Sequence, residues 1–257
     1  MKMTIYDKAT RFHKLHIKGD PVVLFNIWDA GSARAVEEAG AKAIATGSWS
    51  VAAANGFDDG EEMPMDAALA NIKRVVGNVT LPVTLDFEGG YTASLDELKA
   101  NIEKVLDAGA VGINFEDQIV GGEGLYSIDE QSARIAAVRE VVEQRSIPLF
   151  INARTDVFLK TYPAVHTEKQ LEEAVVRAQA YATAGASGFF APGLRDKDLI
   201  RTLCERSPLP VNIMVLPDTP SNKEMAELGV ARISYGPGPY RQMIESLKAS
   251  ASAAFSN

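Results

Sequence analysis

Apolar and polar positions follow a repeated order along the chain: an amphipathic stretch of helical period, a break at small residues, and a short apolar run. The order is clearest in EEAGAKAIATGS, LDAGAVGINFED, ATAGASGFFAPG and AELGVARISYGP, with breaks at Gly40, Gly109, Gly185 and Gly229. Glycine can end a helix at such a break because it adopts the left-handed conformation without strain. Four breaks of one kind predict repeated units of a helix followed by a strand.

The remaining apolar runs extend this pattern to eight strands. We expect them near 22–29, 43–48, 83–88, 112–117, 149–156, 188–193, 211–216 and 232–236. Helices are expected at about 31–39, 66–76, 95–108, 129–144, 168–184, 196–206 and 221–228, with a tail helix at about 239–254. The strands read as apolar on both faces, which is typical of buried parallel strands. The alternation predicts an α/β fold, specifically a (β/α)8 TIM-type barrel.

A doubly wound open sheet is the alternative architecture, and the sequence favours it less. Such a sheet often carries a glycine-rich phosphate loop after its first strand, whereas this chain has IWDAGS at 27–32. A chain of 257 residues that is 46% hydrophobic can bury one large core. Without a linker or low-complexity tract in the sequence, we predict that residues 1–257 form a single domain.

The charge balance limits the class of partner. The formal net charge is -8, from 26 basic and 34 acidic residues, so no net field attracts a polyanion, and we expect no nucleic-acid partner. The single cysteine, Cys204, cannot form an internal disulfide, and the start MKMTIYDKATRF has no apolar segment typical of a signal peptide. We therefore expect a cytoplasmic protein that does not bind membranes.

Acidic residues end two neighbouring predicted strands. Asp86 and Glu88 lie in LDFEGGY, and Glu116 lies in FEDQ. Catalytic groups of barrels gather at the carboxyl ends of the strands, so these side chains are expected to lie together. Three carboxylates without a histidine suit Mg²⁺ or Mn²⁺ better than Zn²⁺. The alternative is that the acids cap helices or pair with lysine and arginine.

Two further strand ends carry groups that suit a carboxylate substrate. Arg154, in INARTD, can clamp a carboxylate or an enolate oxygen through two parallel hydrogen bonds. An internal ion pair of Arg154 with Asp156 or Asp117 is the alternative. Gly47 and Ser48 end the second strand, where a hydroxyl and backbone amides could hold a carboxylate.

Cysteine and histidine chemistry is not expected at this rim. Cys204 lies on a helical face and is typical of a small buried hydrophobe. The histidines at 13, 16 and 166 lie away from the acidic clusters, which disfavours a histidine metal site or a catalytic triad.

Taken together, the motifs resemble the isocitrate lyase and phosphoenolpyruvate mutase superfamily. The similarity runs from about residue 20 to about residue 245, through WDAGSARAVEEAGAKAIATGS, LDFEGGY, FEDQ, INARTD and VNIMVLPDTPSNKEMAELGVARISYGPGPYR. It implies a modified (β/α)8 barrel, usually a dimer of dimers that swaps its last helix between neighbours. It also implies that Mg²⁺ holds an α-oxo carboxylate while a C–C or P–C bond is made or broken beside a pyruvate-type enolate.

The resemblance also implies roles for individual positions. Asp86, Glu88 and Glu116 match the metal acids of the family, with glutamate at 88 where aspartate is usual, so that Glu88 could act through a water. Arg154 matches the arginine that stabilises the enolate. Asp59 matches an acid that orders the metal's waters. The loop that holds the substrate carboxylate is matched by Gly47, Ser48 and Trp49, and two pocket residues are matched by Asn212 and Arg241.

The chain departs from the family in the loop after FEDQ. The sequence IVGGEGLYSIDE lacks the Lys-x-Cys-Gly of the lyases and the lysine and asparagine of the phosphonate enzymes. Glu123 and Tyr126 are the groups of this loop that could transfer a proton, and each could equally be an exposed loop residue. At the sixth strand end, Ala191, Pro192 and Gly193 stand where the lyases carry a glutamate, which favours a shorter oxo acid.

The sequence thus predicts a Mg-dependent lyase that acts on a small 2-oxo or 2-hydroxy carboxylate through a metal-stabilised enolate. A phosphonate P–C mutase or hydrolase is one alternative, although it would need more positive groups. A non-catalytic barrel that binds an oxo acid is the other. We expect a homo-oligomer, either a dimer or a tetramer.

Overall fold

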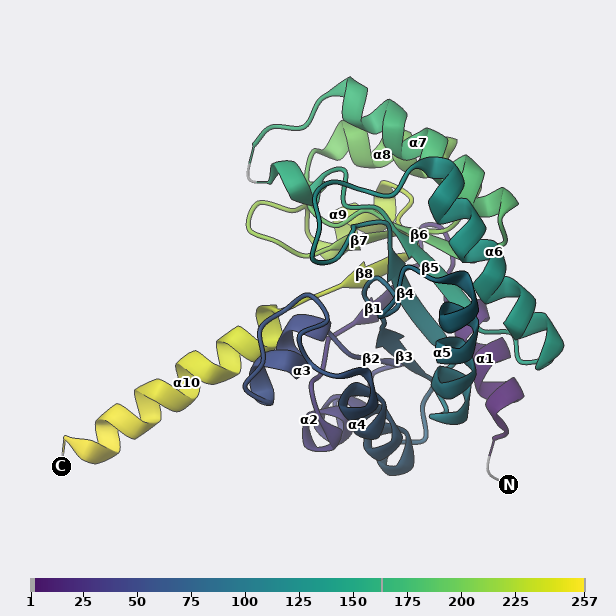
Figure 1. Cartoon of the computed structure of the whole chain (residues 1–257). Coiled ribbons are helices and arrows are strands. Elements are labelled where there is room, and N and C mark those ends of the chain that lie inside the picture. Colours follow the sequence, from purple (N-terminus) through teal and green to yellow (C-terminus); the bar gives the residue numbers. More distant parts are fainter. Residues whose placement is uncertain (1–2, 163, 257) are drawn as a thin grey trace.

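The computed structural model describes residues 3–162 and 164–256, which form a parallel β-barrel surrounded by helices (Figure 1). The strands are hydrogen-bonded in the order β1-β8-β7-β6-β5-β4-β3-β2, and a parallel bridge from Ile27 to Thr46 joins the segments that follow β1 and β2. The predicted barrel is confirmed. Its strands are β1 (Val22–Leu24), β2 (Ile44–Ala45), β3 (Val83–Asp86), β4 (Gly112–Glu116), β5 (Phe150–Arg154), β6 (Gly188–Phe190), β7 (Val211–Met214) and β8 (Arg232–Ser234).

The predicted helices are also present, each within two residues of its expected ends. They are α2 (Ala30–Glu38), α4 (Met65–Asn78), α5 (Leu95–Asp107), α6 (Ile128–Gln144), α7 (Glu168–Thr183), α8 (Lys197–Arg206), α9 (Asn222–Glu227) and α10 (Gly238–Phe255). Within the described ranges, none is long and apolar enough to cross a membrane. The strands are shorter than expected because their last residues leave the ladder to form the rim.

Three helical segments were not predicted: α1 (Ile5–Lys14), α3 (Ser48–Ala54) and the 3-10 turn η1 (Leu159–Thr161). They lie outside the repeated unit, and α3 and η1 are only 7 and 3 residues long. Sequence periodicity is weak over such lengths. Helix α1 begins with a capping box in which Thr4 and Asp7 satisfy each other's backbone N–H groups.

Helix α1 covers the N-terminal end of the barrel. Phe12 is fully buried and meets the ring of Phe150 edge-on, with ring centroids 5.5 Å apart. It packs in a cluster with residues at the strand starts, among them Val22 and Val111. A Cβ on Gly112 would lie 2.7 Å from the Phe12 ring, so the close approach requires glycine there. The site must therefore open at the other end of the barrel.

The inward faces of the strands are not apolar, which corrects the sequence expectation. Arg232 on β8 donates a hydrogen bond to Oδ1 of Asn114 on β4 at 3.0 Å, across the barrel interior. Asn152 on β5 donates to the same oxygen at 2.9 Å. Asn212 and Thr84 are buried as well. A layer of polar side chains thus lies inside the barrel, where its members satisfy part of one another's hydrogen-bonding capacity.

The tail helix α10 leaves the barrel and runs outward from it (Figure 1). Of its described residues, only Pro239 and Tyr240 are buried, whereas Leu247 is 60% exposed. Val23 and Phe25, on and just after β1, are also partly exposed. Exposed apolar side chains therefore lie on α10 and along β1, which pairs with β8, the strand before α10.

Candidate active site

A cavity of about 270 Å³ lies at the carboxyl ends of the barrel strands. Residues that follow β2, β3, β5 and β8 reach it, as expected for a barrel of this type. Seven of the predicted site residues line it: Gly47, Ser48, Trp49, Asp59, Asp86, Arg154 and Arg241.

Asp86 is fixed at the cavity wall by hydrogen bonds to both carboxylate oxygens. The backbone N–H and the hydroxyl of Ser48 each donate to Oδ2 at 3.0 Å, and Nδ2 of Asn114 donates to Oδ1 at 3.3 Å. The Asp86 N–H donates to the hydroxyl of Thr46 at 3.0 Å. The carboxylate is therefore oriented before any ligand arrives.

Glu88 turns away from this cavity. Its backbone is in the left-handed region, with φ of 51°, and its Oε2 accepts hydrogen bonds from the N–H groups of Gly60 and Glu61 at 3.1 and 2.8 Å. Its carboxylate lines a small adjoining hollow of about 10 Å³ together with Asp86 and Tyr91. Burial, followed by the charge of Asp86, raises the pKa of Glu88 to about 8. The Glu88 carboxylate is therefore better placed to hold the loop at Gly60 and Glu61 than to contact a substrate in the cavity.

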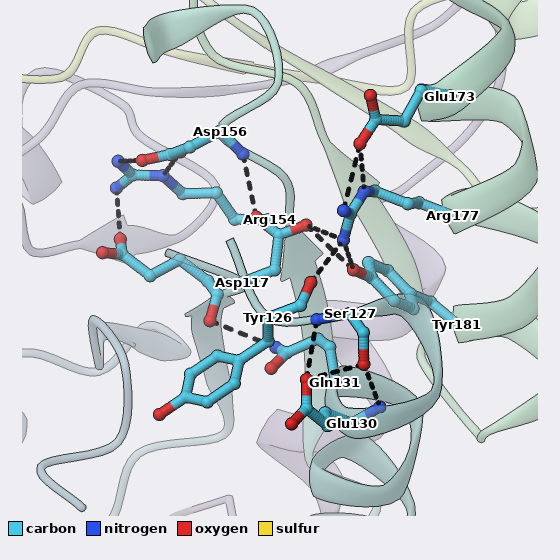
Figure 2. Close-up of polar contacts among 11 residues, drawn as sticks. Asp117, Tyr126, Ser127, Glu130, Gln131, Arg154, Asp156, Glu173, Arg177 and Tyr181 are labelled. Carbon is cyan, nitrogen blue, oxygen red and sulfur yellow. Dashed lines mark hydrogen bonds and ion pairs between the residues drawn. The ribbon is translucent and has the colours of Figure 1, made fainter. Parts of the chain in front are cut away.

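Arg154 lies between two carboxylates and also lines the cavity. Its Nη1 is 2.8 Å from Oε2 of Glu116, and its Nε and Nη2 donate to Asp156 at 2.6 and 2.9 Å (Figure 2). Burial alone would lower the pKa of Arg154, but the charges of Glu116 and Asp156 outweigh that effect and raise it. The internal pair with Asp156 is therefore present, and the guanidinium still faces the cavity.

Asp117 pairs with a different arginine. It accepts hydrogen bonds from Arg177 at 3.1 Å and from the hydroxyl of Tyr181 at 2.8 Å, and its other oxygen accepts from the N–H of Asp156 at 3.0 Å (Figure 2). Asp117 thus holds the backbone of Asp156, whose carboxylate in turn holds Arg154. The two acids of FEDQ therefore pair with different arginines, Glu116 with Arg154 and Asp117 with Arg177.

The loop after FEDQ places its two proton-transfer candidates outside the cavity. The Tyr126 ring lies against the guanidinium of Arg134, 4.5 Å from centroid to carbon, and Tyr126 lines a separate pocket of about 250 Å³. Its carbonyl accepts a hydrogen bond from Arg177 at 3.0 Å (Figure 2). Glu123 is exposed. In this arrangement neither side chain faces Arg154 or Asp86.

The two predicted pocket residues from the last strands take different positions. Asn212 is buried and exchanges hydrogen bonds with the hydroxyl of Ser234 at 3.2 Å, so that Ser234 rather than Asn212 lines the cavity. Arg241 lies over the ring of Trp49 at 4.5 Å, and both line the cavity. Arg241 and Arg154 are the cations among the described residues of the lining.

The lining also contains residues that were not predicted, among them the polar residues Asn26, Asn114 and Ser234. Asn114 precedes Glu116 by two positions, and the period of a strand places both side chains on one face, which is a signal that the sequence does contain. Asn26 carries no such signal. Its Oδ1 accepts from the N–H groups of Tyr235 and Gly236 at 3.0 and 2.9 Å, so it connects the rim after β1 to the rim after β8.

The carboxylates at the rim repel one another. Asp59 is exposed at the mouth of the cavity, where partial loss of hydration and the charge of Asp86 raise its pKa. The charges of Asp86 and Asp59 also contribute to the raised pKa of Glu88. A divalent cation beside Asp86 and Asp59 would relieve this repulsion, and oxygen donors suit Mg²⁺ or Mn²⁺. Across residues 3–162 and 164–256, however, no three such side chains already converge in a metal-binding geometry. Asp86 and Asp59 line the cavity, whereas Glu88 and Glu116 are held by partners of their own.

A barrel whose acids and arginine converge on a cavity at the carboxyl ends of its strands defines an enzyme of the TIM-barrel class. The profile of the phosphoenolpyruvate phosphomutase family matches residues 12–255. The chain belongs to the isocitrate lyase and phosphoenolpyruvate mutase superfamily, as the motifs indicated.

Individual relatives include both lyases and enzymes of phosphonate chemistry. A solved structure from Burkholderia cenocepacia J2315, provisionally assigned as a phosphonomutase, is 48% identical, with a TM-score of 0.95 over 98% of this chain and 100% of that chain. The 2-methylisocitrate lyase of Escherichia coli K12 is 26% identical over 94% of this chain and 82% of its own. A phosphonopyruvate hydrolase solved with oxalate and Mg²⁺ is 20% identical, covers 96% of this chain and 86% of its own, and has a TM-score of 0.83, which shows the shared fold.

Proposed function

We propose that this protein is a Mg-dependent lyase that makes or breaks a C–C bond in a small 2-oxo or 2-hydroxy carboxylate. The observation that carries the proposal is the oriented carboxylate of Asp86, which lines one cavity with Asp59 and Arg154. Loss of hydration and the charge of Asp86 raise the pKa of Asp59. Neighbouring acids of this kind, with the partly buried Arg154 beside them, provide a place for a metal and for developing negative charge. The enzymes among the relatives support this class of chemistry.

Different residues of the cavity would bind the metal and stabilise the charge on the substrate. Asp86 and Asp59 would hold the metal, which would supply positive charge beside the oxygen of a 2-oxo group. Arg154, kept in place by Glu116 and Asp156, would donate hydrogen bonds to the same oxygen as it gains negative charge. This places the reacting end of the substrate between β3 and β5.

The substrate carboxylate would lie against the wall formed after β2. Gly47, Ser48 and Trp49 line the cavity there, and Arg241 lies over Trp49. Ser48 already bonds Asp86, so it would connect the carboxylate site to the metal site. Glu123 or Tyr126 could deliver a proton only after a rearrangement of their loop, because neither lines the cavity.

The phosphonate alternative remains the second candidate because of the Burkholderia structure at 48% identity, which carries a provisional phosphonomutase assignment. A phosphoryl group of charge near -2 needs several cationic or amide donors. Within the described lining, Arg154 is already paired twice and Arg241 is the other cation. The cavity therefore favours a carboxylate substrate.

The proposal also includes exchange of α10 between subunits of a dimer or tetramer. Helix α10 buries little of its own surface, and an isolated helix of 18 residues is marginal in water. Val23 and Phe25 expose apolar surface at β1, beside the strand that precedes α10. A neighbour's α10 could cover that surface.

The deciding experiment is thermal melting of the protein with Mg²⁺, oxalate and both together. We expect a joint stabilisation larger than either alone, because a metal site and a ligand site in contact bind cooperatively. Asp86→Ala should abolish it. Asp58→Ala is the matched control, since Asp58 is exposed in the same loop as Asp59 and lines none of the pockets described above.

Turnover of a panel of 2-hydroxy and 2-oxo acids and phosphonates then separates a lyase from a phosphonate enzyme and from a binding protein. Loss of the joint stabilisation in Asp58→Ala as well as in Asp86→Ala would point to a general charge effect. Absence of any joint stabilisation in the wild-type protein would refute the metal-dependent site.

A further inference from the structure

The cavity is charged on one side and apolar on the other. Asp86 ends β3 and Arg154 ends β5, and the polar lining continues through Asn114 on β4 between them. The next elements around the barrel contribute a different chemistry. From η1 through β6 to the end of β7, the lining residues are Leu159, Tyr162, Phe190, Met214 and Leu216.

Close packing holds this apolar arc in place. Gly193 follows β6 with φ of +94°, and a Cβ there would lie 2.8 Å from the backbone nitrogen of Leu159, so η1 sits directly on the β6 loop. Likewise, a Cβ on Gly236 would lie 2.7 Å from the sulfur of Met214. The arc is therefore a preformed wall and not a loose loop.

Charged groups near the arc are directed to other partners. Arg195 lies 4.9 Å from the centroid of the Tyr162 ring and 3.8 Å from Oδ2 of Asp218, and it is not part of the cavity lining. The β6 end contributes Phe190, 4% exposed, followed by Ala191 and Pro192. Of the five side chains of the arc, Tyr162 alone carries a hydrogen-bonding oxygen, its hydroxyl. A carboxylate or phosphonate directed at the other four would lose its hydration without gaining a charged partner in this part of the described lining.

We propose that the arc from η1 to β7 is a specificity subsite for an uncharged alkyl group, so that the preferred substrate is a 2-oxo or 2-hydroxy acid with a short branched or linear alkyl chain. The inference rests on the proposed function, because the metal, Arg154 and the wall after β2 fix the acid end. With the acid end fixed there, the chain beyond the oxo group extends toward Phe190 and Met214. A cavity of about 270 Å³ accommodates several such carbons.

The test measures dissociation constants by calorimetry in the presence of Mg²⁺ for oxalate, pyruvate, 2-oxobutanoate and 2-oxopentanoate. From pyruvate to 2-oxopentanoate, affinity should rise by about fourfold for each added methylene, because each is buried against the arc. Oxalate reports on binding at the acid end alone. A second comparison uses two ligands of nearly equal shape. 4-Methyl-2-oxopentanoate should bind at least about tenfold more tightly than oxaloacetate, whose terminal carboxylate would meet the apolar wall. Phosphonopyruvate should likewise bind weakly.

Leu159→Lys provides the diagnostic variant. Leu159 is only partly buried, and a lysine there would place a cation at the subsite without disturbing the acid end, so the preference should shift toward oxaloacetate. Leu95→Lys is the matched control on α5, where Leu95 is 41% exposed, and it should leave the ratio unchanged. Melting curves confirm that both variants fold.

The outcomes separate this inference from the proposed function. Metal-dependent binding of oxalate and pyruvate without any gain along the alkyl series, or with tighter binding of oxaloacetate or phosphonopyruvate, overturns the alkyl subsite and leaves the proposed function standing. Absence of metal-dependent binding by oxalate and pyruvate overturns both. The wild-type series decides the question even if Leu159→Lys fails to fold.

Discussion

At the scale of single residues, Asn114 connects the barrel interior to the candidate active site. Its Oδ1 accepts hydrogen bonds from Asn152 and Arg232, and this fixes its Nδ2 as the donor to Asp86. Arg232 is fully buried, and burial lowers its pKa to about 9. Its Nε and Nη1 have no hydrogen-bond partner among the described residues. Asn114 is therefore a principal contact for this cation.

Removing that contact should be costly, whereas removing both groups should not be. Asn114→Leu should lower the free energy of unfolding by about 3 kcal/mol, because it leaves a buried cation without its acceptor. The double variant Asn114→Leu, Arg232→Met should regain most of that loss. Urea unfolding of the four proteins of this cycle measures the coupling. Additive losses in the double variant would show that the two side chains act independently.

Glu88 makes the stability of the metal-free protein depend on pH. Its pKa is about 8 in the folded protein against an ordinary 4.5, so between these pH values the folded state retains a proton that the unfolded chain has lost. Stability should therefore fall as pH rises through this interval, by on the order of 5 kcal/mol, and level off above it. Glu116, whose pKa burial also raises, acts in the same direction.

The measurement is chemical unfolding in a chelating buffer from about pH 5 to about pH 9. Glu88→Gln should flatten the decline, because an amide can still accept the hydrogen bonds from Gly60 and Glu61 and does not ionise. An unchanged slope in this variant would assign the pH dependence to other acids.

At the scale of elements, α1 lies outside the repeated unit and packs against the N-terminal end of the barrel. Phe12 → Ala should lower the free energy of unfolding by about 3–5 kcal/mol, because it leaves a cavity between α1 and β5. Tyr6→Ala is the control, since Tyr6 is on the same helix but is 56% exposed, and its effect should be within about 0.5 kcal/mol. Equal losses in the two variants would mean that α1 contributes through its helical content and not through Phe12.

At the scale of the whole molecule, the exposed apolar surfaces predict an assembly. If the full chain assembles as proposed, a chain truncated after Gly238 should be monomeric, because α10 can no longer cover Val23 and Phe25 on a neighbour. Light scattering after size exclusion measures the mass. Leu247→Glu is a milder variant on α10, and Leu95→Glu on α5 is its control. A truncated chain of unchanged oligomeric state would exclude helix exchange as the basis of assembly.

The order of strands and helices, and most of the helix ends, could be predicted from the sequence. Amphipathic periods and glycine breaks are local, so they are readable in the chain. The sequence also placed Asp86, Glu116 and Arg154 at strand ends, and the barrel then brings those ends to one rim. The polar interior was not predicted, because it depends on contacts such as that of Arg232 with Asn114, which are 118 positions apart. Helix α1 was also not predicted, although its capping box is a local signal, because it lies outside the repeated unit.

The tertiary structure alone decided how the polar groups are divided among partners. Glu116 pairs with Arg154, and Tyr126 lies against Arg134. Glu88 accepts hydrogen bonds from the backbone N–H groups of Gly60 and Glu61. None of these contacts follows from spacing along the chain. The apolar arc also arises only in three dimensions, because η1, β6 and β7 each contribute one or two residues to it. Local sequence patterns predict the order of the elements and the position of each motif. The partner of a buried polar side chain depends instead on all the groups that the fold brings around it.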